Sequence, residues 1–423
     1  MTSFLGVVVF LLAFIVLLGF FNEKVTKFTY EISLMLFSII IGAVLLLLRV
    51  TLGEETTVLQ IIKNLDFTKL ETILMEGMLC FMLFAGSCHM RLLDFKKHAK
   101  TISFLAIGAT LIGAILYGAL FYVVSMILGL SLSFPVCLMF GSIVAPTDPI
   151  AATSILKKFN LPSNIGFIIE GESLLNDGVG VALFVCFSGI VSAQENGGFF
   201  AVMSKELFGA ILVGIGVTLI CFPIFNHSKD VTRQIFTSLL AVAAAYFACE
   251  HWGFSGAIAS VVCGVLFSAG RNWKEMKGEI WELEHFDVFW EIMDNLMNSV
   301  LYVMLGLSFC QILQMQYVLI LSAAAIVLNL VCRAGSVGAA AIAAGKLPDG
   351  YDKKSFIKLL TWGGLRGGLS VALAMSTREM VTEDIYYIIL GGTYALVFFT
   401  TIVQGMTMPK VYNKIKMSLE KGN

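Results

Sequence analysis

Charged residues are scarce in this chain: Asp, Glu, Lys and Arg make up 13% of its 423 residues, about half of the roughly 25% found in a typical soluble domain. Hydrophobic residues make up 58%, and uncharged apolar runs recur throughout. The first run, Phe4–Phe21, is long enough to cross a hydrocarbon core of roughly 30 Å. It lacks a basic leading segment and a small-residue cleavage site, so we expect a retained span and not a signal peptide. The composition excludes a soluble fold and predicts an all-α polytopic membrane protein.

The motifs of several functional classes are also missing. The nine cysteines form no Cys-x-x-Cys pair and show no metal-ligand spacing, so neither a zinc site nor a disulfide framework is expected. No glycine-rich phosphate loop follows a strand pattern. The longest loops have about 20 residues, too few for a separate domain. We therefore expect no cofactor, no nucleotide and no nucleic-acid partner, and any chemistry must take place within the membrane.

Hydropathy, with breaks at Gly, Pro and charged residues, predicts about thirteen transmembrane helices. Their approximate limits are residues 4–22, 30–49, 70–90, 101–129, 132–156, 165–192, 206–225, 234–250, 254–270, 286–310, 316–345, 356–377 and 385–408. Repeat one would occupy residues 4–192 and repeat two residues 234–408, with a linker helix at residues 206–225. Corresponding spans are seven apart, an odd number, so the second copy is inverted. We expect two inverted six-helix repeats in one membrane domain that comprises residues 1–423.

The distribution of basic residues supports this count and orients the chain. Loops after odd-numbered spans, together with the C-terminal tail and with Lys358 at the edge of a span, hold 21 of the 28 Lys and Arg residues. The N-terminus and the loops after even-numbered spans, with Arg49 at the edge of a span, hold 5. Basic loops stay on the cytoplasmic side. We therefore expect the N-terminus outside, and a short cytoplasmic tail at residues 409–423, in a protein of the cell membrane.

Ionisable residues inside spans are costly in a bilayer and are therefore candidates for function. They are Glu76, Asp148, Glu170, Glu172, Asp177, Arg333 and Arg366. A position near the membrane surface explains Glu170. For Arg333 two readings stay open, a functional role and a snorkelling side chain near the cytoplasmic end of its span. Glu76 fits the mouth of an outer cavity.

Two of these candidates lie in segments typical of interrupted helices. Pro146 and Pro149 flank Thr147 and Asp148 and remove backbone donors, so the helix should unwind there. Four glycines surround Arg366 in the sequence GGLRGG and weaken that helix. Unwound backbone at membrane depth must be buried in protein or line a wet cavity. Interrupted spans in corresponding positions of two repeats indicate a transporter site, and we expect them to cross near the midplane.

The stretch GESLLNDGV, residues 171–179, places polar side chains on two faces of one helix. Ser173 and Asp177 are four residues apart and share a face, where their oxygens suit a hard monovalent cation. Glu172 and Asn176 share the adjacent face, which suits a guanidinium group.

Combining this stretch with the interrupted helices gives a candidate cation site and a candidate ion pair. We expect Na⁺ to be held by oxygens of four residues: Asp177, Asp148, Ser173 and Thr147. Glu172 and Arg366 are expected to form a buried ion pair that holds two helices in register.

Three motifs carry a resemblance to a known family: APTDP at residues 145–149, GESLLNDGV at residues 171–179 and GGLRGGLS at residues 363–370. In this order they resemble the monovalent cation/proton antiporter superfamily, specifically its sodium/proton exchanger branch of the NhaP/NHE type, over essentially the whole chain. The resemblance implies that Asp177 binds either the cation or the proton. It also implies that Asn176 marks the Asn-Asp branch, which is usually electroneutral.

The resemblance further implies a secondary antiporter and not an enzyme, exchanging Na⁺ or Li⁺ for H⁺ in pH homeostasis. Such proteins are typically homodimers in membrane lipids, with a core domain that moves against a dimerisation domain. K⁺/H⁺ exchange on the same fold and a passive cation channel remain open alternatives. An alternative from another class is an intramembrane aspartyl protease using Asp148 and Asp177. Those enzymes share a Gly-x-Gly-Asp motif, whereas Asp177 follows Leu-Asn.

One position departs from the family pattern. Many exchangers of this type carry an acid in the third span, beside a proline pair. Here the sequence MLCFMLFAGS places Phe84 at that position, without the prolines. Glu76 lies about two turns earlier and is the candidate replacement.

Overall fold

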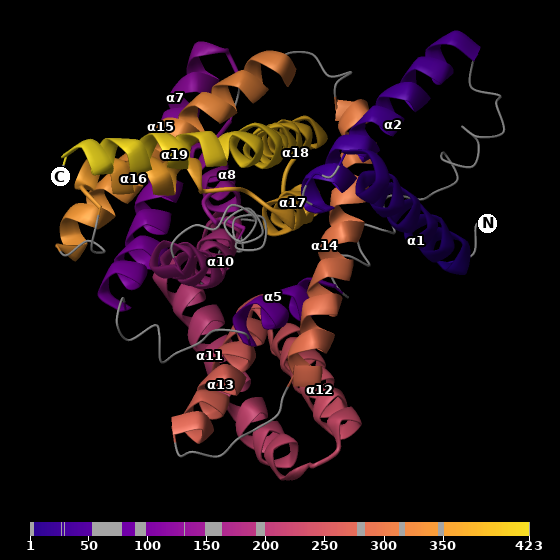
Figure 1. The fold of residues 1–423 in the computed structure, drawn as a ribbon, viewed down its shortest axis with the longest axis vertical. Helices are drawn as coiled ribbons and strands as arrows, with labels where there is room; N and C mark the ends of the chain where they lie inside the picture. Colours follow the sequence, from indigo (N-terminus) through magenta and orange to yellow (C-terminus); the bar gives the residue numbers. More distant parts are fainter. Residues whose placement is uncertain are drawn as a thin grey trace.

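The computed structural model describes residues 4–26, 28, 30–52, 78–88, 99–130, 132–148, 163–191, 199–276, 284–312, 318–345 and 351–422. Within these ranges every regular element is helical (Figure 1). The α-helices are α1 (Phe4–Phe21), α2 (Tyr30–Leu52), α5 (Leu79–Cys88), α7 (Thr110–Ile127), α8 (Phe134–Val144), α10 (Ser163–Val191), α11 (Phe199–His227), α12 (Val231–Trp252), α13 (Gly256–Met276), α14 (Glu284–Ile312), α15 (Val318–Ala344), α16 (Lys353–Trp362), α17 (Gly368–Met375), α18 (Glu383–Phe398) and α19 (Gly405–Gly422). Shorter π-helical and 3₁₀ turns join some of them: η1 (Asn22–Thr26), η3 (Phe104–Ala109), η4 (Ser376–Glu379) and η5 (Phe399–Gln404).

Each range predicted from hydropathy overlaps one of these helices. Seven helices among the described residues are long and apolar enough to cross a membrane, and four shorter apolar helices accompany them. The all-helical membrane architecture is thus confirmed, whereas the number of thirteen crossings and the inverted repeats stay predictions. The predicted tail, residues 409–423, is helical as far as Gly422, because α19 continues from the last span and packs on α16.

Most helices belong to one of two groups (Figure 1). The first bundle contains α7, α8, α10 and α15–α19, and the second bundle contains α5 and α11–α14, with α1 and α2 packed on α14. In the first bundle, Phe140 packs edge-on against Phe121 and Tyr117, with ring centroids 4.8 and 5.3 Å apart. In the second, Trp290 of α14 packs against Phe84 of α5 with centroids 4.5 Å apart. Close packing of this kind stabilises helix contacts in lipid, where the hydrophobic effect between helices is weak.

Both predicted interruptions are present. Helix α8 ends at Val144, and residues 145–148 continue without helical structure. The second break lies at residues 363–367, between α16 and α17. The two breaks meet, because the Asp148 backbone N–H donates to the Leu365 carbonyl at 2.8 Å. Each unwound segment therefore satisfies part of the other's backbone at a depth where water is scarce.

Candidate functional site

The unwound segment after α8 is fixed to α10 by a compact set of hydrogen bonds. The Thr147 backbone N–H donates to Asn176 Oδ1 at 3.1 Å, and Asn176 Nδ2 donates to Thr147 Oγ1 at 2.7 Å. The hydroxyls of Thr147 and Ser173 lie 2.9 Å apart, and all three side chains are buried. The Asn176 amide therefore positions the break, and the expectation that it shares a guanidinium with Glu172 is wrong.

Asp148 links the two bundles. Its Oδ2 accepts a hydrogen bond from the Tyr302 hydroxyl of α14 at 2.7 Å, while its backbone belongs to the break at the end of α8. The first turn of α17, which starts at Gly368, lines the same cavity as Asp148. A helix N-terminus carries partial positive charge and favours a carboxylate nearby. Asp148 is thus contacted by residues of both bundles.

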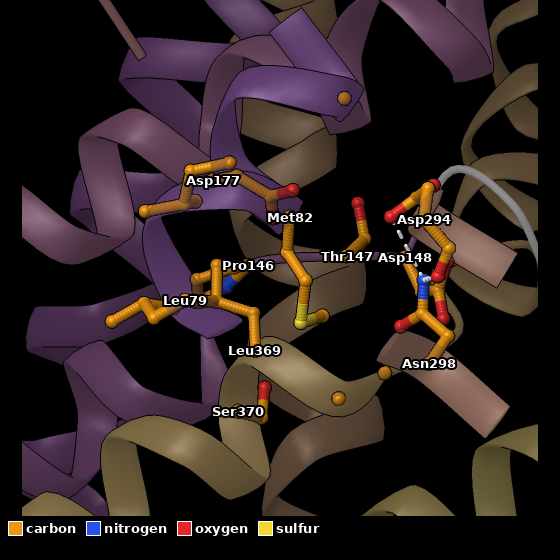
Figure 2. Close-up of a pocket in the computed structure, with 14 residues that line it drawn as sticks. Leu79, Met82, Pro146, Thr147, Asp148, Asp177, Asp294, Asn298, Leu369 and Ser370 are labelled. Carbon is orange, nitrogen blue, oxygen red and sulfur yellow. Dashed lines mark hydrogen bonds between the residues drawn. The ribbon is translucent and has the colours of Figure 1, made fainter. Parts of the chain in front are cut away.

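A cavity of about 50 Å³ lies where the bundles meet, large enough for a few water molecules. Three carboxylates line it, those of Asp148, Asp177 and Asp294. In the view of Figure 2, Asp177 lies on one side, and Asp294 and Asn298 lie on the other. No described residue donates a hydrogen bond to the Asp177 carboxylate. Asp177 is thus left available to a ligand from the cavity.

Only some of the predicted site residues lie at the cavity. Thr147, Asp148 and Asp177 all border the cavity, and Ser173 reaches it through the Thr147 hydroxyl. Among the described residues, no three Asp, Glu, His or Cys side chains converge closely enough to hold one metal ion.

The buried ion pair involves a different arginine from the one expected. Arg333 of α15 places its Nη2 atom 2.6 Å from Glu172 Oε1, and both side chains are almost fully buried. Arg366 instead donates to the carbonyls of Ala145 and Pro146. The prediction of a Glu172–Arg366 pair is thus wrong, and so is a snorkelling position for Arg333.

The unwound segment explains why Arg366 bonds backbone carbonyls and not Glu172. Prolines in the break leave carbonyls without helical donors, and a guanidinium offers five N–H groups in a planar fork. Arg366 Nη1 donates to Pro146 O at 2.6 Å, and Nη2 donates to Asn329 Oδ1 at 2.8 Å. Its own backbone is held by Thr400 and Thr401. Arg366 therefore stabilises the crossing of the two breaks.

Comparison with known proteins identifies the family of this chain. The sequence model of the transmembrane sodium/hydrogen exchangers matches residues 55–414. The chain belongs to the sodium/hydrogen exchanger family. The Na(+)/H(+) antiporter NhaP of Pseudomonas aeruginosa is 32% identical over 379 residues, which cover 85% of this chain and 84% of that protein. The Na(+)/H(+) antiporter NhaH of Halobacillus dabanensis is 32% identical over 301 residues, covering 68% and 70%.

A solved structure shows the same fold. The sodium proton antiporter MjNhaP1 from Methanocaldococcus jannaschii, at pH 8, superposes with a TM-score of 0.75 over 97% of this chain and 98% of that chain. The two sequences are 20% identical, so the likeness concerns the fold. The family resemblance read from the three motifs is confirmed.

Sequence reasoning missed the contribution of α14. Asp294, Asn298 and Tyr302 follow one another at intervals of four and share one helix face. Asp294 and Asn298 line the cavity, and Tyr302 bonds Asp148. That spacing was the available signal, because residues 286–310 were expected to form a span. Of the remaining candidates, Glu76 lies outside the described residues, and Glu170 is half-buried on α10.

Gly367 gives a direct test of how tightly the breaks are packed. A Cβ atom at this position would overlap the Asp148 carboxylate, so Gly367→Ala should displace that side chain and destabilise the protein by about 1–3 kcal/mol. Thermal unfolding in detergent should show a lowered Tm, with reduced transport in proteoliposomes. Gly216→Ala in α11 is the matched control, because no atom lies within 4 Å of its added methyl group. Equal Tm values for the two variants would show that the packing at Asp148 is loose.

Proposed function

We propose that this chain exchanges Na⁺ for H⁺ across the cell membrane by alternating access, with both ligands competing for Asp177. The proposal rests on the position of the Asp177 carboxylate. It borders the cavity between two bundles and receives no hydrogen bond from a described residue. Ionised, it attracts a cation; protonated, it no longer provides the charge that holds one. The names of the relatives, Na(+)/H(+) antiporters, agree with this exchange.

Neutral oxygens complete the proposed Na⁺ site. Thr147 and Ser173 supply hydroxyl groups, and Asp148, which follows Thr147 in the break, supplies a second carboxylate to the cavity. Hard cations prefer oxygen ligands. Li⁺ fits the same chemistry, and K⁺ is the competitor that a transport assay must include.

Alternating access follows from the position of the cavity between the bundles. A movement of one bundle against the other would open the cavity first to one side of the membrane and then to the other. If this movement occurs only with Na⁺ or H⁺ on Asp177, transport is an obligatory exchange, driven by differential binding to the two states. We further propose a homodimer in membrane lipids, with the N-terminus outside and the C-terminus in the cytoplasm.

The proposed stoichiometry is one Na⁺ for one H⁺, and Asn176 is the reason. Asn176 is neutral and is already bonded to Thr147, which leaves Asp177 as the carboxylate that alternates between ligands. The loaded site then has the same net charge with either ligand. The membrane potential should therefore do no net work on the cycle, whereas one uncompensated charge moved through 100 mV is worth about 2.3 kcal/mol.

Proteoliposomes containing the purified protein test this function. Imposed Na⁺ gradients should drive opposite H⁺ movement, and the reversal point should follow the Na⁺ and H⁺ gradients alone. Clamping the potential with K⁺ and valinomycin should leave that point unchanged. A shift equivalent to nearly fifty-fold in the gradient per 100 mV would show unequal stoichiometry. Proton flux driven by K⁺ and not by Na⁺ would identify a K⁺/H⁺ exchanger, and cation flux without proton coupling would identify a channel.

A further inference from the structure

Asp294 is a carboxylate in the interior of α14, a helix predicted from hydropathy to span the membrane, and it has no basic partner among the described residues. It is the eleventh residue of α14, which has 29 residues, so it lies far from either helix end. No Lys, Arg or His among the described residues forms an ion pair with it. A carboxylate in this position is costly and is retained only with a partner or a function. Its side chain lines the cavity shared with Asp148 and Asp177, so a ligand can supply what the protein does not.

The neighbouring helix provides no carboxylate at this wall. Helix α5 contributes Leu79, Met82 and Leu83 to the cavity. Phe84 is fully buried and packs against Trp290. Phe84 therefore belongs to the aromatic core of the second bundle and not to the cavity. Within the described residues, Asp294 is the only charged side chain that the second bundle brings to the cavity.

Asn298 gives an independent indication of a ligand. Its side chain is 8% exposed, and its Nδ2 donates to Asp294 Oδ1 at 3.0 Å and to Asp294 O at 3.1 Å. Its Oδ1 lies beside Gly368, in the first turn of α17 that lines the cavity. No described residue donates to that oxygen. An amide oxygen at the edge of a cavity that receives no hydrogen bond from a described residue is a good ligand for a hard cation or its water.

We propose that Asp294, with Asn298 Oδ1, is a second cation-binding station on the wall of the cavity opposite Asp177. This inference rests on the proposed cation exchange and adds a residue to its path. The three cavity carboxylates do not converge on one point, so Asp294 acts as a separate step and not as a third ligand in one cage. Tyr302, two turns further along α14, bonds Asp148 and thereby connects the two stations.

Titration of the purified protein with Na⁺, at constant ionic strength, tests the proposal through ligand-dependent thermal stabilisation. Asp294→Asn keeps the shape of the side chain and removes its charge, and it should weaken apparent Na⁺ affinity about tenfold. Glu284→Gln is the matched control, because Glu284 is exposed at the start of the same helix and does not line the cavity. It should titrate like the native protein. Equal midpoints for Asp294→Asn and Glu284→Gln would overturn the station at Asp294.

Two further variants separate a binding role from a purely structural one. Asp294→Glu keeps the charge and should retain most of the affinity. Asn298→Ala keeps the Asp294 side chain but removes both the amide oxygen and the Nδ2 donor to Asp294 Oδ1, and it should raise the apparent KM for Na⁺ in proteoliposomes several-fold, with a smaller change in maximal rate. An unchanged KM in Asn298→Ala would also overturn the proposal. A native protein that binds Na⁺ without exchanging it would overturn the proposed function alone, whereas one stabilised by neither Na⁺ nor K⁺ would overturn both.

Discussion

Replacing Asp177 with Asn should abolish Na⁺-driven proton movement and leave the protein folded. The amide has nearly the shape of the carboxylate, and no described residue loses a hydrogen bond to Asp177. The side chain lines a cavity large enough for water, so the amide can remain hydrated. Because the variant neither attracts Na⁺ nor carries a transferable proton, we expect at least a hundredfold loss of flux, corresponding to about 2.7 kcal/mol or more.

The measurement is the initial rate of pH change in proteoliposomes after a Na⁺ pulse, at equal amounts of reconstituted protein. Asp384→Asn is the matched control, since it makes the same chemical change on the exposed first turn of α18 and should transport normally. Retention of ordinary flux by Asp177→Asn would remove Asp177 from the centre of the mechanism. Loss of flux together with a large fall in Tm would point to a structural role.

Local sequence signals predicted the breaks and the residues around Asp177 well. Proline and glycine act on their own backbone, so the ends of α8 and α16 could be located from the chain alone. The spacing within residues 171–179 fixed which side chains share α10. The contact of Thr147 with Ser173 and Asn176 then depended only on the break lying against that helix.

The sequence alone could not predict which of the distant charged groups pair with one another. The chain has two intramembrane arginines, and either of them could neutralise the charge of Glu172. The choice depends on the rotation of α15 and α17 and on the competing oxygens of Pro146 and Asn329, which already engage Arg366. None of these is encoded in the spacing of charged residues.

The α14 stripe was missed for a different reason. Asp294 lies in a helix that also carries exposed acidic residues near its start. Acidic residues near a helix N-terminus are expected from the helix dipole. In the sequence, Asp294 therefore could not be distinguished from the acids expected at the start of this helix. The repeat of polar residues at positions 294, 298 and 302 was present in the sequence, but only the packing of α5 and α17 gives that face a cavity to line.

Breaking the ion pair between Glu172 and Arg333 should have the largest effect on the stability of the protein. Glu172 and Arg333 are 1% and 4% exposed, with Oε1 and Nη2 2.6 Å apart. Removing one partner leaves the other charge buried and uncompensated, which costs about 3–5 kcal/mol. Glu172→Gln and Arg333→Gln should therefore each lower Tm strongly, while the double substitution should cost much less than their sum.

The double-mutant cycle, measured by unfolding in detergent, isolates the interaction between the two side chains. Asp230 and Arg233 offer a matched comparison: their charged groups are 3.6 Å apart, but the side chains are 52% and 79% exposed. Solvent and salt screen such a pair, so its coupling should be at most about 1 kcal/mol. A third cycle, between Glu172 and Arg366, should give a smaller coupling than Glu172 with Arg333, because the Arg366 guanidinium is bonded to Pro146 and Asn329. If the Arg366 cycle gave the larger value, the pairing described for α10 and α15 would be wrong, and the break at residues 145–148 would need another partner for its carbonyls.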